Sequence, residues 1–186
     1  ALRAVIAGEV LVDDVVAASA AAKVAHDASV RVRTRGDGRF VSRGGRKLQA
    51  ALDGFGLSAA GLRCCDVGSS TGGFTDCLLQ NGAAHVACVD VNYGQLAWKV
   101  RSDPRVTVFE RTNVKEADPA ALGAPFDAVV IDVSFIGLAQ LAPVLARLCR
   151  PGSLLVALVK PQFESQRGET EGGVVRDEAV RLRTVE

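Results

Sequence analysis

The sequence has few of the residues that build metal centres or cross membranes. It holds no Met and two His, and none of its five cysteines forms a C-x-x-C pair. We therefore expect buried thiols in a reducing compartment and no metal site. The apolar runs, such as Leu154 to Val159, are far shorter than the roughly 20 residues of a membrane helix, and no segment resembles a signal peptide. These absences predict a cytoplasmic protein without a membrane partner.

The remaining composition is that of a globular chain with one basic segment. The chain is 48% hydrophobic and 23% charged, with a net charge of +1. Residues 31–47 nevertheless contain seven cations and one anion, Asp37, an excess of six positive charges. Such an excess is typical of a phosphate-contacting surface, although a solvated linker fits a charge run equally well. The candidate RNA-binding residues are Arg31, Arg33, Arg35, Arg39, Arg43 and Arg46.

The chain divides by pattern into a small unit and a larger domain. Residues 1–33 carry short apolar runs, and Val30 to Arg33 alternates apolar and basic side chains, which predicts a strand. This is too little for an independent core, and there is no initial Met, so we expect a remnant whose first part is absent. Glycine-rich turns at 35–38 and 42–45 mark a boundary. We assign 1–38 to the small unit, 39–46 to a basic linker and 47–186 to the larger domain.

The larger domain alternates predicted helices and strands. Five β-α units in a row imply an α/β fold with a doubly wound, mostly parallel sheet, whose ligands bind at the carboxyl ends of the strands. The last segment, 176–186, predicts a helix that would leave the sheet partly uncovered, so we expect further C-terminal material. The predicted strands span 62–67, 85–91, 105–109, 128–133 and 153–160, and the helices span 47–53, 73–80, 95–101, 119–122 and 138–149.

A glycine-rich loop follows the first predicted strand. Dinucleotide-binding loops place glycine at i, i+2 and i+5, but Ser70 stands at the second of these positions, which argues against a nicotinamide dehydrogenase. A strand-borne acid followed by G-x-x-x-G-G instead resembles motif I of class I methyltransferases, where the loop holds the methionine part of S-adenosyl-L-methionine. The candidate cofactor residues in this loop are Asp66, Gly68, Ser69, Ser70, Thr71, Gly72, Gly73 and Phe74.

Two polar residues end the next two strands. Asp90 lies 22 residues after Gly68, where an acid accepts hydrogen bonds from ribose hydroxyls. Asn113 follows the third strand, a natural place for an adenine contact, although an isolated Asn there also fits a turn. Together with the loop, these residues predict a nucleoside ligand.

Three charged residues are expected to meet at the same edge of the sheet: Lys47, Asp132 and Lys160. Charges at the ends of apolar strands are unfavourable unless they are paired or functional. These residues therefore fit two interpretations, a salt bridge and a catalytic set. A ribose 2′-hydroxyl needs a base, or a cation that stabilises its alkoxide, and a lysine beside a carboxylate can supply either. In-line positioning of oxygen, methyl and sulfur would supply most of the rate. Asp132 is also a candidate cofactor residue.

The residues after the fourth strand favour oxygen as the methyl acceptor. An enzyme that methylates an amino group would be expected to carry a polar-Pro-Pro-aromatic run at this place. The chain instead has Asp132-Val133-Ser134-Phe135.

Several longer motifs are spread along the chain: residues 42–48 (SRGGRKL), 66–76, 90–98 (DVNYGQLAW), 110–114 (ERTNV), 132–135 (DVSF) and 159–164 (VKPQFE). Together they resemble the TlyA-type, "hemolysin-like" ribosomal RNA 2′-O-methyltransferases. The resemblance implies a class I S-adenosylmethionine-dependent methyltransferase fold with a partial S4-type RNA-binding domain in residues 1–33. It also implies a Lys-Asp-Lys-Glu tetrad, of which Lys47, Asp132 and Lys160 match the first three members and the Glu would lie beyond residue 186.

The implied reaction is methylation of the ribose of cytidine in ribosomal RNA, with ribosomal subunits as the substrate. One alternative is an RNA-binding module that holds S-adenosylmethionine without turnover. A second, a secreted or membrane-active toxin, is disfavoured by the short apolar runs.

Overall fold

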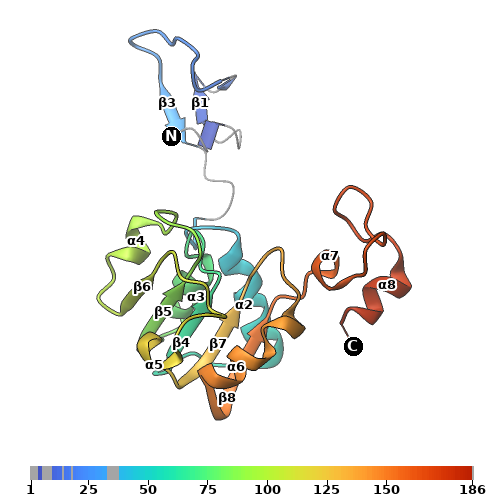
Figure 1. Ribbon diagram of the computed structural model, residues 1–186. Coiled ribbons are helices and arrows are strands. Elements are labelled where there is room, and N and C mark those ends of the chain that lie inside the picture. The colour runs from blue at the N-terminus through green and yellow to red at the C-terminus, as the bar shows by residue number, and fades with distance from the viewer. Residues whose placement is uncertain (1–3, 6–9, 14, 18, 33–37, 186) are drawn as a thin grey trace. The chain divides into compact units, whose positions relative to one another are not determined.

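The computed structural model describes residues 4–5, 10–13, 15–17, 19–32 and 38–185 (Figure 1). It divides the chain into two compact units, Ala1–Arg39 and Phe40–Glu186. Most of the segment expected to be a linker, 39–46, therefore belongs to the second unit, where Phe40 and Gly45 are buried. Arg33 and Arg35 lie outside the described residues.

The first unit contains a three-stranded antiparallel sheet in the order β2-β1-β3. Its strands are β1 (Val10–Val12), β2 (Val15–Val16) and β3 (Val30–Val32), and β3 falls within the predicted strand. Val15 and Val30 are 69% and 57% exposed. This sheet alone therefore buries little apolar surface, and its assignment to an S4-type domain stays a prediction.

The second unit is built on a parallel sheet with the strand order β6-β5-β4-β7-β8. Chain order runs outward from β4 to β6 and then returns to β7 on the other side of β4. The predicted doubly wound sheet is confirmed, and the reversal in strand order falls between β4 and β7 (Figure 1). The strands are β4 (Arg63–Val67), β5 (His85–Val89), β6 (Val106–Phe109), β7 (Phe126–Ile131) and β8 (Cys149–Ala157).

Helices cover both faces of this sheet because alternate residues of each strand point to opposite sides. On one face, Cys64 packs in a core with α2 (Gly44–Phe55), α3 (Gly73–Gln80) and α4 (Trp98–Arg101). On the other face, Cys65 packs with α5 (Pro119–Leu122), the 3-10 helix η1 (Leu138–Gln140) and α6 (Ala142–Leu148).

Burial raises the pKa of the Cys64 thiol to about 12, so this thiol stays protonated at neutral pH.

Most predicted elements differ from the structure at one or both ends, and the following differences matter most. The predicted helix 138–149 is divided into η1 and α6, because Pro143 lies in the first turn of α6, where a missing N–H is tolerated. The predicted helix 95–101 begins only at Trp98, since Ala97 has an extended backbone. Strand β8 ends at Ala157, and a short helix α7 (Pro161–Glu164) follows it. The terminal helix α8 spans Glu178–Arg183 within the predicted 176–186.

Candidate active site

Two adjoining cavities open where the parallel strands end. Their volumes are about 620 and 310 Å³, and they share Gly68, Ser70, Asp132 and Ser134 as lining residues. The shared residues come from the loops after β4 and β7, the two strands between which the strand order reverses. The cavities therefore lie where a doubly wound sheet binds its ligands.

The glycine-rich loop is shaped by close contact with the end of β7. Gly68 has a φ of +85°, and a Cβ at this position would lie 2.8 Å from the carbonyl oxygen of Asp132. Its N–H donates to Val89 O at 2.8 Å. Residue 68 must therefore lack a side chain for the loop to pass between the neighbouring strand ends. Ser69, Ser70, Thr71, Gly73 and Phe74 line the larger cavity with Gly68, whereas Gly72 lines neither of the two.

Asp90 joins this loop to the one after β5. Its Oδ2 accepts the Ser70 N–H at 2.7 Å, and its Oδ1 accepts the Asn92 N–H at 2.7 Å. The Asn92 side-chain amide donates to the same Oδ1 at 3.0 Å. The carboxylate is thereby fixed in the wall of the smaller cavity, 9% exposed. Sequence reasoning missed Asn92, although a polar residue two positions after a strand-ending acid is a usable signal.

The smaller cavity has apolar walls that suit a flat ring. Val67, Val114, Ile136 and Leu141 contribute to its lining. Asn113 also lines it, but its amide is engaged in a local turn: Nδ2 donates to Glu116 Oε1 at 2.7 Å, and Oδ1 accepts the Lys115 N–H at 3.2 Å. The turn interpretation of Asn113 therefore describes its present contacts, and its contact with adenine stays a prediction.

Lys47, Asp132 and Lys160 come together in the wall of the larger cavity, as predicted. Asp132 Oδ1 lies 2.5 Å from Lys160 Nζ, and Oδ2 lies 3.4 Å from Lys47 Nζ. Lys160 Nζ also donates to Val133 O at 2.7 Å and Ser134 Oγ at 3.1 Å. The Lys160 side chain is 18% exposed and that of Lys47 is 49% exposed. One carboxylate thus holds two cations at the edge of a cavity.

Asp66 lies beneath the loop and lines neither cavity. Its side chain is fully buried, and its Oδ2 accepts the Thr75 hydroxyl at 2.6 Å. Its Oδ1 has no hydrogen-bond partner among the described residues. Burial raises its pKa to about 7 despite the hydrogen bonds from Thr75, which lower it. The structure therefore gives Asp66 a role in joining β4 to α3 instead of direct contact with a ligand in these cavities.

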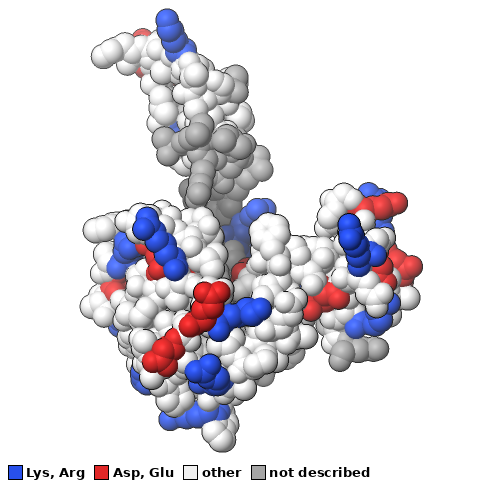
Figure 2. All heavy atoms as spheres, viewed as in Figure 1, with Lys and Arg blue, Asp and Glu red and all other residues white. Residues whose placement is uncertain are grey.

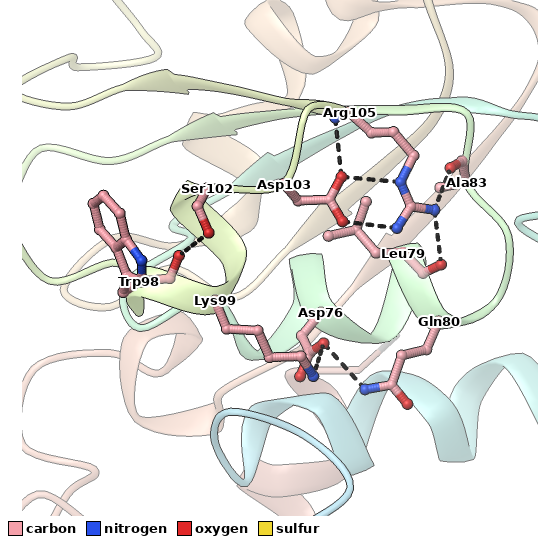
Figure 3. Close-up of polar contacts among 9 residues, drawn as sticks. All are labelled: Asp76, Leu79, Gln80, Ala83, Trp98, Lys99, Ser102, Asp103 and Arg105. Atoms are coloured by element: carbon pink, nitrogen blue, oxygen red, sulfur yellow. Dashed lines mark hydrogen bonds and ion pairs between the residues drawn. The ribbon is translucent and has the colours of Figure 1, made fainter.

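A second buried carboxylate, Asp76 of α3, holds the segment that leads into α2 and also binds Lys99 and Gln80, the two contacts drawn in Figure 3. Its Oδ2 accepts the Val41 N–H at 2.8 Å. Its Oδ1 accepts Lys99 Nζ and Gln80 Nε2, both at 3.0 Å. Val41 directly precedes residues 42–44, which line the larger cavity ahead of Lys47. Asp76 thus contributes to the placement of Lys47, a role for which the sequence offered no signal.

The candidate RNA-binding arginines are distributed over both units. Arg31 lies on β3 of the first unit, and Arg39 is the last residue of that unit. Arg43 lines the larger cavity of the second unit, and Arg46 is exposed on α2. On the face of the second unit that Figure 2 shows, basic and acidic side chains are interspersed without forming one large patch.

The chain has the architecture of a class I S-adenosylmethionine-dependent methyltransferase. An S-adenosylmethionine-dependent methyltransferase from Mesorhizobium loti shares this fold with a TM-score of 0.50 and 20% identity, over 62% of this chain and 54% of that one. The pattern of FtsJ-like methyltransferases matches residues 40–186, and the chain belongs to this family.

Two relatives cover nearly the whole chain. The Mycobacterium tuberculosis protein named 16S/23S rRNA (cytidine-2′-O)-methyltransferase TlyA is 48% identical over 180 residues, which are 96% of this chain and 67% of that protein. A hemolysin-named structure from Streptococcus thermophilus superimposes with a TM-score of 0.80 at 39% identity, covering 99% of this chain and 68% of that one. This chain thus spans about two thirds of each relative.

Two features are absent from the described part of the chain. No helix there is long and apolar enough to span a bilayer. Within the same residues, no cluster of three or more His, Cys, Asp or Glu side chains is arranged to hold a metal ion.

Proposed function

We propose that this chain carries the catalytic domain of an enzyme that transfers a methyl group from S-adenosyl-L-methionine to a ribose 2′-hydroxyl of ribosomal RNA. The observation that carries the proposal is the pairing of Asp132 with both Lys47 and Lys160 at a cavity beside the glycine-rich loop. Membership of the FtsJ-like family and the likeness to a named ribosomal RNA (cytidine-2′-O)-methyltransferase support it. Cytidine is the proposed nucleoside, and the proposed compartment is the cytoplasm, where ribosomes are assembled.

The residues of the two cavities fit S-adenosylmethionine. Asp90 would accept hydrogen bonds from its ribose hydroxyls, and the apolar walls of the smaller cavity would take the adenine ring. The loop from Gly68 to Phe74 would hold the methionine part in the larger cavity. When bound, the cofactor supplies an electrophilic methyl group on a sulfonium.

The lysines and Asp132 would act on the acceptor hydroxyl. Lys160 is the less exposed of the two cations and is fixed by three oxygen atoms, so its Nζ has a defined position. There the ammonium group would stabilise the developing alkoxide, and only after losing a proton, as the free amine, would it accept the proton of the hydroxyl. Asp132 orients both lysines, and Lys47 adds a second positive charge at the cavity wall. Preorganised charges of this kind act on the transition state without reorganising during the reaction.

RNA binding is proposed to involve both units. The small first unit would be part of an S4-type RNA-binding domain, and the arginines from Arg31 to Arg46 would contact phosphates. A single-stranded or flipped nucleotide would be needed, because a ribose hydroxyl inside a helix cannot enter a cavity beside a buried cofactor. Because two small domains read the shape of RNA better than its sequence, an assembled ribosomal subunit is the proposed substrate.

The proposed function is tested by methyl transfer to ribosomal subunits. The full-length protein is incubated with S-adenosylmethionine labelled in the methyl group, and the RNA is digested to nucleosides. We expect labelled 2′-O-methylcytidine, formed far more slowly with Lys160→Ala. Binding of the cofactor, measured by calorimetry, together with no transfer to either subunit would instead indicate an RNA-binding module without turnover. Absence of cofactor binding would overturn the methyltransferase assignment for this site.

A further inference from the structure

The segment after β8 is joined to the segment after β7 at three successive points. The first is Lys160, whose Nζ contacts Asp132, Val133 and Ser134. The second is a ring contact between Phe163 and Phe135, with centroids 5.4 Å apart. At the third point, Glu164 Oε1 accepts the Leu138 N–H at 2.8 Å. Lys160 is part of the proposed catalytic set, whereas Glu164 is not.

Glu164 is fixed relative to Lys160 by a single helical turn. Helix α7 spans Pro161–Glu164, with Lys160 as its N-cap residue. The Phe163 N–H donates to Lys160 O at 2.9 Å, and the Ser165 N–H donates to Pro161 O at 2.8 Å. Because these bonds close the turn, a displacement of Glu164 is passed to Lys160 through four residues of ordered backbone.

The Glu164 carboxylate caps a helix to which it does not belong. Leu138 is the first residue of η1, and its N-cap residue, Gly137, offers no side chain. The first N–H groups of a helix have no partner within the helix, and a carboxylate is a strong acceptor for them. Glu164 supplies this acceptor from the neighbouring loop. Its hydrogen bond is therefore one of the three contacts that hold together the two loops that carry Asp132 and Lys160.

Gly137 shows that the two loops fit closely at this point. A Cβ on Gly137 would lie 2.8 Å from Glu164 Oε2 and 3.1 Å from Phe163 O. The Gly137 backbone has φ −74° and ψ 145°, a conformation open to any residue. The backbone here would accept any residue, but a Cβ would displace the Glu164 carboxylate.

We propose that Glu164 is a positioning residue for methyl transfer, which keeps Lys160 Nζ against Asp132 by holding the α7 turn on the segment 132–138. This inference rests on the proposed function. Glu164 does not line either cavity, so it acts through Lys160 and not on the substrate. Loss of its hydrogen bond should lower the rate of the chemical step more than it weakens cofactor binding, since the loops of Gly68 and Asp90 do not contain Glu164, although Ile136 and Leu141 beside Leu138 line the smaller cavity.

Three variants of the full-length protein test the proposal, each assayed for single-turnover methyl transfer, cofactor affinity and melting temperature. Glu164→Ala removes the acceptor, and its rate should fall about ten- to a hundredfold, as expected for a small misplacement of a reacting group. Glu164→Gln keeps an oxygen that can accept the Leu138 N–H and should restore most of the rate. Gly137→Ala should displace the carboxylate and lower the rate in the same direction as Glu164→Ala.

The double variant Gly137→Ala/Glu164→Ala separates positioning from general stability. If the Cβ acts by displacing Glu164, the double variant should transfer methyl no more slowly than Glu164→Ala alone, because the two changes share one contact. Wild-type rates in Glu164→Ala, equal loss in Glu164→Gln and Glu164→Ala, or a rate loss matched by weaker cofactor binding would overturn the proposal. A wild-type protein that binds the cofactor but transfers no methyl group would overturn the proposed function itself.

Discussion

The Asp132 carboxylate lies 2.5 Å from the ammonium group of Lys160, and its second oxygen also reaches a cation, Lys47 at 3.4 Å. Lys47 is on α2, which precedes the first strand of the parallel sheet, and Lys160 follows β8, the last strand of that sheet in the chain. The salt-bridge and catalytic interpretations of these residues are therefore compatible, because the same pairing that neutralises Asp132 holds both cations at the cavity.

Replacement of Lys160 should separate turnover from cofactor binding. Lys160→Ala removes the group placed at the acceptor hydroxyl, so the single-turnover rate constant should fall by about 10²- to 10⁴-fold. Lys160→Arg keeps the positive charge, but a guanidinium does not release its proton in proteins. If Lys160 acts by stabilising the alkoxide charge, Lys160→Arg should recover activity. If Lys160 acts by accepting the proton, Lys160→Arg should stay as slow as Lys160→Ala. A Lys160→Ala protein that turns over at the wild-type rate would show that the catalytic assignment is wrong.

Substitution of Gly68 should damage the cofactor site through steric overlap. An alanine Cβ would lie 2.8 Å from Asp132 O, in a backbone with φ +85°. We expect Gly68→Ala to destabilise the fold by about 1–3 kcal/mol and to abolish measurable binding of S-adenosylmethionine. Gly152 is a matched control, because its φ is +87° and a Cβ there would have no atom within 4 Å. Gly152→Ala should carry the backbone strain alone and bind the cofactor normally, as calorimetry and denaturant unfolding would show.

Asp66 should make the protein less stable as the pH rises through the weakly acidic range. Its pKa is raised from 3.8 to about 7 in the folded state, mainly by burial. Between these values the unfolded chain releases the proton that the folded chain retains, so the free energy of unfolding falls with rising pH. The contribution is fully present below about pH 4 and is lost by about pH 7, with an order of magnitude of about 4 kcal/mol.

This pH dependence can be measured by urea unfolding of wild type and Asp66→Asn at several pH values from about 4 to about 8, a range that spans the titration of the Asp66 carboxyl in the unfolded and folded states. The slope that is specific to Asp66 should disappear in the variant. Thr75→Val removes the hydroxyl that lowers this pKa, so it should move the loss of stability to higher pH. Identical pH profiles in wild type and Asp66→Asn would contradict a raised pKa.

Charge reversal at Arg43 and Arg46 should weaken RNA binding and flatten its dependence on salt. Each phosphate contact that is lost should reduce the slope of log affinity against log salt concentration by about one unit. Arg147, exposed on α6 at the opposite face of the sheet from α2, is a suitable control for net charge. Filter binding to ribosomal RNA at several salt concentrations gives the slope. Equal loss of RNA and cofactor binding would indicate that these arginines support folding.

Local patterns predicted the order of elements correctly and their ends less well. The helix Gly73–Gln80 and the short helix Pro119–Leu122 have the predicted bounds, because glycine and proline mark their limits. The prediction of one continuous helix over 138–149 was wrong, because the segment forms two helices. The apolar spacing continues across Pro143, but the helical hydrogen bonds do not. Cys149 was placed at the end of that helix but begins β8, an outcome decided by pairing with β7.

Part of the site could also be predicted from sequence. Asp132 and Lys160 meet because the parallel strands β7 and β8 place their carboxyl ends at one edge of the sheet, and Lys47 reaches the same cavity from α2. Asp66 has the same motif-based signal as its neighbours, yet it lies in the core, bonded to Thr75. Which side of the sheet a strand residue faces depends on the register of the whole strand, and the motif alone does not specify it.

The sequence by itself determined the fold class, the loop that suits a cofactor and the three charged residues of the site, because each depends on the chemistry and spacing of residues along the chain. The tertiary structure alone decided how those groups are held. The Asp76 bond to Val41 and the Glu164 bond to Leu138 join residues 35 and 26 positions apart. Such contacts leave no periodic signal, since they depend on the relative placement of loops that only the packed sheet and its helices fix.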